Sequence, residues 1–274
     1  MGLLGAFHAD EQLHRYVTSQ LESSRGEASV RLGLVTSGAV LATLFRELVT
    51  LGDALALAQT MVDIGKLAGK PVVAVITSMA QPLGTHIGNA LEVKDAIDVL
   101  AGRTQGDLLE ISLLLGSHML VLAEKAKTLP EARAMLENAL SSGAGLRKLA
   151  EMIAAQGGDV TYLDNPTRFP AAHFAETVPA PRDGYLVSMN AQAIGTVSVS
   201  LGAGRAKKDD AIDPAAGILL HKKPGDRVRA GEPLCTLYTG KSAALSDAAA
   251  AFVAAVTIGD NPPPMASPLL GVIR

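Results

Sequence analysis

At 274 residues, with hydrophobic side chains making up 48% of the sequence, the chain is long enough to bury the core of one domain or of two modest ones. Its 24 basic and 27 acidic side chains give a net charge of −3, which offers no electrostatic field to attract a nucleic acid. A single cysteine, Cys235, excludes an internal disulfide and a cysteine-based zinc site, so we expect a buried structural thiol in a reducing cytoplasm.

No membrane span is predicted. The most apolar stretch, 108–123, is interrupted by polar residues that include Glu110, Ser117 and His118. The sequence also shows no N-terminal signal of charged and then apolar residues. We therefore expect a cytoplasmic protein without a membrane partner.

Residues 1–52 contain no clear chemical motif. The pattern over 11–21 fits a short helix and that over 30–40 fits a strand, although Gly33 and Gly38 weaken the strand prediction. We interpret 1–52 as a separate N-terminal segment. An upstream truncation, or a shifted reading frame that ends near Asp53, would also explain its lack of motifs.

From Asp53 the pattern becomes regular. A helix is predicted over 53–68, with Asp53 as its cap, and the short apolar run 72–76 is typical of a parallel strand covered on both faces. A second helix is predicted over 89–101. This alternation predicts an α/β domain with a parallel sheet over 53–156. Three more helices are predicted within it: from Gly106 to about Lys125, from Thr128 onward, and over 146–155.

Four prolines punctuate residues 157–182, which predicts an extended linker. Short strand-like segments and an Ala-rich helix over 241–256 follow it, so residues 183–274 are predicted to form an α+β C-terminal domain. The strand-like segments cover 184–189, 193–201, 217–220 and 233–238.

Between the predicted strand 72–76 and the predicted helix 89–101 runs a loop rich in turn residues. It leaves the carboxyl end of the strand, which is where ligands bind in open α/β sheets. Its sequence, continued into the helix, reads Q-P-L-G-T-H-I-G-N-A-L-E-V-K-D-A over 81–96. This run resembles the signature region of the pyrimidine nucleoside and thymidine phosphorylases.

The resemblance extends from about Asp53 to about Pro264 and covers the later part of that family's chain. It includes G-D-L-L-E, L-G-S-H-M-L, A-A-Q-G-G-D, L-G-A-G-R and G-I-L-L-H-K-K-P-G-D-R-V. It implies an α/β domain followed by an α+β domain. It also implies phosphorolysis, in which phosphate attacks C1′ of a pyrimidine nucleoside and gives the free base and a pentose 1-phosphate.

A potassium ion is also implied by the resemblance. The carbonyl oxygens of Leu83 and His86 and the carboxylate of Asp95 would bind it, and oxygen atoms are the ligands that hard cations take. The family usually has Glu at the position of Asp95 and a small residue at that of His86. For His86 taken alone, an ordinary loop histidine is favoured over a catalytic base. Glu92 is interpreted as a surface carboxylate near a helix start.

Several elements of the family's site come from its upstream region. These are the Gly-rich phosphate loop, the pyrimidine-binding Arg, Ser and Lys, and the remaining carbonyl ligands of the ion, and none can be placed in this sequence. Residues 36–39, T-S-G-A, are similar to the family's strand-end T-G-S-G-A, but they lie too far from Asp53 for a role to be transferred. The implied partners are a pyrimidine nucleoside, phosphate and a second copy in a homodimer. We expect little or no activity from this chain alone.

Two other functions are weighed. One is a non-catalytic remnant or binding module with the fold of the later half of the family. The other is a carrier domain, because G-D-x-V-x-x-G-E-x-L over 225–234 resembles biotinyl and lipoyl carriers, although their modified-lysine hairpin is missing. An anion site at 202–208 is disfavoured against a tight turn beside a solvated run of charges.

Overall fold

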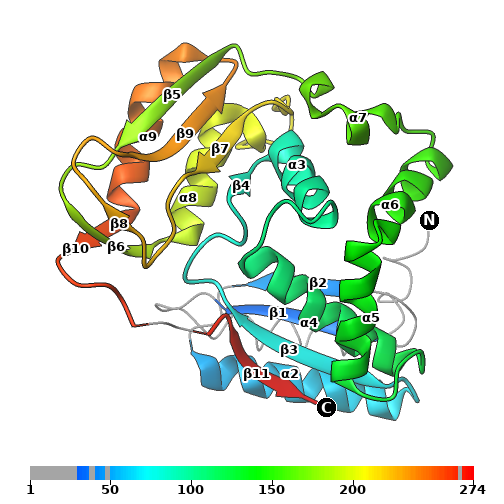
Figure 1. The fold of residues 1–274 in the computed structure, drawn as a ribbon. Coiled ribbons are helices and arrows are strands. Elements are labelled where there is room, and N and C mark those ends of the chain that lie inside the picture. The colour runs from blue at the N-terminus through cyan, green and yellow to red at the C-terminus, as the bar shows by residue number, and fades with distance from the viewer. Residues whose placement is uncertain (1–29, 37–40, 47–49, 265–266) are drawn as a thin grey trace.

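The computed structural model describes residues 30–36, 41–46, 50–264 and 267–274 (Figure 1). The helix expected over 11–21 lies outside the described residues. The strand expected over 30–40 is described as far as residue 36, where β1 (Val30–Thr36) ends.

The first sheet has the strand order β11-β3-β1-β2. Its other strands are β2 (Leu41–Arg46), β3 (Val72–Ser78) and β11 (Leu269–Ile273). Both neighbours of β3 run antiparallel to it, so the prediction of a parallel sheet was wrong. The continuous apolar run of β3 indicates only that the strand is buried on both faces. A strand can be buried in this way whether its neighbours are parallel or antiparallel. The α/β character of this part of the chain was predicted correctly.

Helices cover this sheet on both sides (Figure 1). α2 (Leu51–Leu67) packs on β3, β11 and β1, and α4 (Asp107–Leu122) packs on β1 and β3. Ala54, Ala58 and Val62 of α2 are fully buried against Ala74 and Ile76 of β3. The cap of α2 is Thr50, whose side chain accepts the Asp53 N–H, and Asp53 itself lies in the first helical turn.

Three further helices are present where the sequence predicts them. They are α3 (Asn89–Leu100), α5 (Leu129–Ser141) and α6 (Ala144–Ala155). Val99 of α3 and Leu109 and Leu113 of α4 form a small buried cluster beside α5. Thr128 caps α5 through its hydroxyl, which accepts the Glu131 N–H, so the predicted start of this helix is confirmed.

The expected linker 157–182 is only partly extended. It contains the short helix α7 (Thr161–Asp164), the 3-10 turn η1 (Pro166–Arg168) and strand β5 (Phe174–Pro179). β5 pairs with β9 (Pro233–Thr239) along its whole length, so the end of the expected linker belongs to a sheet of the C-terminal part. Pro179 is tolerated at the end of the strand, where the register shifts.

The C-terminal part contains two antiparallel sheets, of order β4-β7-β9-β5 and β10-β6-β8. The strands not yet introduced are β4 (His86–Ile87), β6 (Gly184–Met189), β7 (Gly217–Leu220), β8 (Arg227–Val228) and β10 (Val256–Gly259). The helical elements are α8 (Ala191–Ser198), the π-helical turn η2 (Val199–Ala203), the 3-10 turn η3 (Ser242–Ala244) and α9 (Leu245–Ala254). The predicted α+β class is therefore confirmed.

Residues 193–201 are helical, and the prediction of a strand there was wrong. The Asn190 side chain accepts the Ala193 N–H and starts the helix. Ile194, Val197 and Leu201 then fall on one buried face at helical spacing. The β-branched residues of this segment favour a strand locally, but burial of this face against the core decides the outcome.

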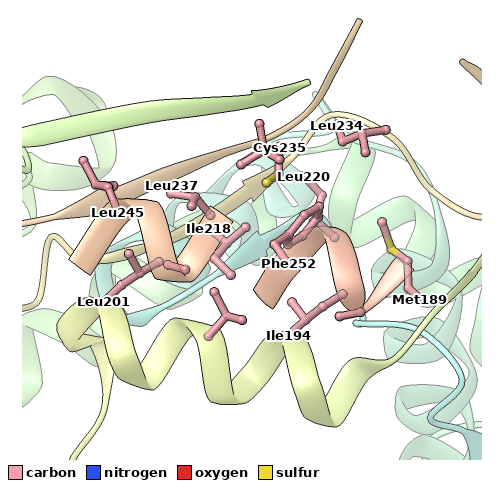
Figure 2. Close-up of a cluster of buried hydrophobic side chains, with 14 of the residues drawn as sticks. Met189, Ile194, Leu201, Ile218, Leu220, Leu234, Cys235, Leu237, Leu245 and Phe252 are labelled. Carbon is pink, nitrogen blue, oxygen red and sulfur yellow. The ribbon is translucent and has the colours of Figure 1, made fainter. Parts of the chain in front are cut away.

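The C-terminal core lies between these helices and the sheets. Figure 2 shows Phe252 of α9 and Ile194 of α8 together with Ile218 of β7 and Leu237 of β9. Cys235 is fully buried in the same cluster, as the sequence predicted. No helix in the described residues combines the length and apolar character needed to cross a membrane.

Strand pairing crosses the expected domain boundary twice. β4 comes from the loop after β3 and pairs with β7, in the C-terminal part. β11 lies at the end of the expected C-terminal domain and pairs with β3 in the first sheet. The first pairing fixes the loop between β3 and α3 against the C-terminal part, and the second ties residues 269–273 to the first sheet.

Candidate functional site

The loop between β3 and α3, residues 79–88, is called the signature loop below. Gly84 and Gly88 have φ angles of 70° and 134°, which disfavour any other residue. A Cβ atom at Gly84 would lie 2.5 Å from Asp95 Oδ2, and one at Gly88 would lie 2.5 Å from the Ala216 carbonyl oxygen. Both glycines therefore allow the loop backbone to approach its neighbours closely.

Asp95 lies on α3 and turns its carboxylate to the signature loop. The residue is only 3% exposed. Its Oδ2 atom accepts the Thr85 N–H at 3.1 Å, and its Oδ1 atom lies 3.5 Å from His86 Nδ1. Burial alone would raise the pKa of Asp95, but the hydrogen bonds from His86 and from the Thr85 N–H outweigh it and hold this pKa below its ordinary value. Asp95 is therefore a buried, ionised carboxylate.

His86 contacts two groups through the same ring nitrogen. Its Nδ1 atom lies 3.0 Å from Thr85 Oγ1 as well as near Asp95. His86 also belongs to β4, where it is paired with Leu219 of β7. The ring is thus held by its neighbours on the Nδ1 side.

Of the three predicted potassium ligands, His86 and Asp95 are neighbours, but their contact is made by the His86 ring and not by the carbonyl oxygen that was predicted to bind the ion. Leu83 lies three residues earlier in the same loop and is partly buried. The donor set does not form a closed cage for a hard cation, because the Asp95 carboxylate already faces the Thr85 N–H and the His86 ring. In the described residues, no three acidic, histidine or cysteine side chains gather as metal ligands would. Potassium at Leu83, His86 and Asp95 stays a prediction.

Sequence reasoning missed two residues of this site, Asp107 and Lys223. Lys223 follows β7, and its ammonium group donates to the carbonyl oxygens of Pro82 and Gly84 and to Asp107 Oδ2. Asp107 begins α4, and its Oδ1 atom accepts the Gly84 N–H at 3.0 Å. Both residues stand in motifs that carry the family resemblance, G-D-L-L-E and H-K-K-P-G-D, and that was the signal available in the sequence.

Two weaker candidates have structural roles. Glu92 accepts the Gly88 N–H at 3.2 Å through Oε1 and so caps α3, in agreement with its interpretation as a carboxylate at a helix start. In the Gly-rich turn that follows η2, the Ala206 and Lys207 N–H groups both donate to Asp210 Oδ2. An internal carboxylate already occupies these amides, as expected for a structural turn.

Comparison with known proteins matches both parts of the fold. A model of the glycosyl transferase family a/b domain matches residues 28–146, and so begins upstream of Asp53. A model of the pyrimidine nucleoside phosphorylase C-terminal domain matches residues 185–259. Together the two models cover most of the chain.

Two relatives show the same similarity. The pyrimidine-nucleoside phosphorylase of Geobacillus stearothermophilus is 50% identical over 191 residues, which make up 70% of this chain and 44% of that protein. That of Staphylococcus aureus is 47% identical over 212 residues, or 77% of this chain and 49% of that protein. The chain thus spans about half the length of the curated relatives it matches. From the two domain models and these relatives, the chain belongs to the pyrimidine nucleoside phosphorylase family.

Proposed function

We propose that this chain serves the phosphorolysis of a pyrimidine nucleoside or deoxynucleoside, to the free base and a pentose 1-phosphate. The observation that carries the proposal is the signature loop, which is held by Asp95, Asp107 and Lys223 within a chain that belongs to this family. Relatives of this family that match the chain at 47% and 50% identity are named pyrimidine-nucleoside phosphorylases.

The reaction makes three physical demands. A phosphate oxygen forms a bond to C1′ while the bond from C1′ to the base nitrogen breaks, and the base leaves with the electron pair and takes up a proton. Phosphate must be held in line with C1′, negative charge on the base must be stabilised, and water must be excluded. The signature loop supplies a backbone segment that Asp95, Asp107 and Lys223 hold in place. The family's phosphate loop and its set of pyrimidine-binding residues cannot be placed in this sequence.

We therefore propose that the chain alone turns over slowly or not at all. Loss of one preorganised donor typically costs about 10²–10³ in rate, and donors that act together are not additive. The test measures base release from thymidine and from uridine with the full chain and phosphate. A rate within the ordinary enzyme range of about 1–10³ s⁻¹ would show that residues 1–52 complete the site.

A chimera separates an incomplete enzyme from a non-catalytic remnant. Residues 1–52 are replaced by the part of the Geobacillus stearothermophilus phosphorylase that precedes the matched region. If phosphate-dependent base release appears, the later part of this chain retains a working phosphorylase framework. If the chimera folds and stays inactive, the remnant alternative is correct. The full-length relative, assayed alongside, sets the scale.

The carrier alternative is opposed by the positions of the lysines near the resembling segment. A carrier needs its modified lysine at an exposed hairpin tip. Lys222 is paired with Glu232 at 2.6 Å, and Lys223 is paired with Asp107 at 2.9 Å. Neither ammonium group is free to carry a cofactor. A potassium ion at the signature loop and a homodimer stay predictions from the family.

A further inference from the structure

Lys223 donates to three oxygen atoms at the signature loop. Its Nζ atom contacts the Pro82 carbonyl oxygen, the Gly84 carbonyl oxygen at 2.9 Å and Asp107 Oδ2 at 2.9 Å. An ammonium group has three N–H donors and no acceptor, so these contacts satisfy it completely. The Lys223 side chain is only 21% exposed, which limits competition from water.

The three acceptors have the chemistry of a small cation site. They are two carbonyl oxygens, on either side of Leu83, and one carboxylate oxygen. Hard cations in proteins choose oxygen ligands of this kind. Here the positive charge is already present and is covalently attached to the chain.

Asp107 contacts the signature loop through both oxygen atoms of its carboxylate, and Lys223 through one of them. Its Oδ1 atom accepts the N–H groups of Gly84 and Leu108, and its Oδ2 atom accepts Gln81 Nε2 as well as Lys223. The Lys223 N–H in turn donates to Asp226 Oδ2 at 2.7 Å, which fixes the turn that carries the lysine. Residues 81–84 are thereby held between the start of α4 and the turn after β7.

We propose that Lys223 is the resident cation of the signature loop. It is a positioning residue that holds the carbonyl groups of Pro82 and Gly84, and it makes the order of residues 81–85 independent of dissolved potassium. This inference goes beyond phosphorolysis and does not depend on it. It concerns a different set of atoms from the family's ion ligands, since it uses the carbonyl groups that flank Leu83.

The first test measures amide hydrogen exchange in peptides that cover residues 81–88 of the full chain. In the wild type we expect equal protection in potassium chloride and in tetramethylammonium chloride, since the tetramethylammonium ion is too large for the site and has no N–H donor. Protection that falls about ten-fold or more on removal of potassium would overturn the proposal. This arm requires no substitution.

The second test compares Lys223→Ala with Lys222→Ala. Lys222 is also 21% exposed, lies in the same turn and pairs with Glu232, so it is a matched control. Hydrogen bonds from a charged group are among the stronger ones, and we expect Lys223→Ala to lower protection at Gly84 and Thr85 about ten-fold or more. Lys222→Ala should leave these amides unchanged. Equal protection in Lys223→Ala and the wild type would contradict the proposal.

Chemical rescue distinguishes a cation site from a general loss of packing. Propylammonium replaces the atoms that Lys223→Ala removes, so it should restore protection of residues 81–85 in that variant. Tetramethylammonium carries the same charge without a donor and should not. If both ions restore the protection of residues 81–85, or if neither does, Lys223 does not act as a cation that donates hydrogen bonds to the loop. All readouts are of exchange, so a lack of phosphorolysis would leave them unaffected.

Discussion

Gly88 and Gly217 lie against each other where the signature loop meets the C-terminal sheet. A Cβ atom at Gly217 would stand 2.2 Å from the Ile87 carbonyl oxygen and 3.2 Å from Gly88 Cα. One at Gly88 would stand 3.0 Å from Gly217 Cα. No side chain fits at either position, and the pairing of β4 with β7 depends on this contact.

We predict that Gly217→Ala lowers the free energy of unfolding by at least about 1–3 kcal/mol, because the added methyl group must displace backbone atoms and Gly217 has a positive φ angle. Urea unfolding, monitored by circular dichroism, measures this free energy of unfolding. Gly195→Ala is the control, because Gly195 lies within α8 with open space around it and should gain up to about 1 kcal/mol. Equal stability of the Gly217 variant and the wild type would contradict the close contact.

The Cys235 thiol should be inert in the native protein. It is fully buried, and burial raises its pKa, so very little reactive thiolate is present at neutral pH. A colorimetric thiol reagent at pH 8 should detect no reaction until guanidinium unfolds the chain, and one thiol per chain thereafter. Because Cys235 is the single cysteine of the sequence, a fast native reaction could come from no other residue.

His118 should make the chain less stable in mild acid. It is buried in α4, and burial, followed by the positive charge of Arg274, lowers its pKa from the ordinary value of 6.5. The unfolded chain then binds a proton more readily than the folded one. Stability from this residue is therefore complete above pH 6.5 and falls as the pH drops from there, by up to about 1.4 kcal/mol per pH unit.

Thermal unfolding between pH 7.5 and pH 5.5 tests this dependence. We expect the midpoint of the wild type to fall more steeply with pH than that of His118→Gln. The substitution also changes packing, so the slopes are compared and not the absolute midpoints. Parallel slopes would exclude His118 as the source.

Glu124 is expected to be a site of local strain. It is the one non-glycine residue with a positive φ angle in the described part of the chain, at 56°. It follows α4 in a Schellman turn, in which the Lys125 N–H donates to the Leu120 carbonyl oxygen and the Glu124 N–H to that of Val121. The equivalent positions after four other helices are glycines: Gly69, Gly102, Gly143 and Gly157.

We predict that Glu124→Gly raises the free energy of unfolding by about 1 kcal/mol, because glycine adopts this conformation without steric cost. Ala123→Gly, one residue earlier and at a negative φ angle, should instead lower it by about 0.5–1 kcal/mol. Denaturant midpoints of the two variants should move in opposite directions. A shift of both in the same direction would rule out strain at Glu124.

The sequence predicted most helices because apolar spacing and capping residues are local signals. α3, α5 and the burial of β3 could all be read from a few consecutive residues. The direction of the strands beside β3 could not, because a run buried on both faces looks the same in either arrangement. The helix over 193–201 was missed because its β-branched residues favour a strand locally, while its burial is decided by α9 and the sheets.

The site was predictable where its residues are close in sequence. His86 and Asp95 fall within the signature run, and the resemblance placed them together. Lys223 and Asp107 are 116 residues apart, and their contact depends on how the C-terminal sheet meets the first part. Nothing in the spacing of the sequence indicates that these two parts meet, so no role was predicted for Lys223.

The pairing of β11 with β3 has a consequence for the order of folding. Most of the described chain lies between the two strands, so the entropy cost of closing this loop precedes the contacts that compensate for it. We expect this ladder to form late, after α2 has packed on β3. Until then one edge of β3 presents unpaired N–H and C=O groups that a strand of another molecule can bind. The rate at which residues 269–273 pair with β3 therefore determines how long the newly made protein can aggregate through this edge.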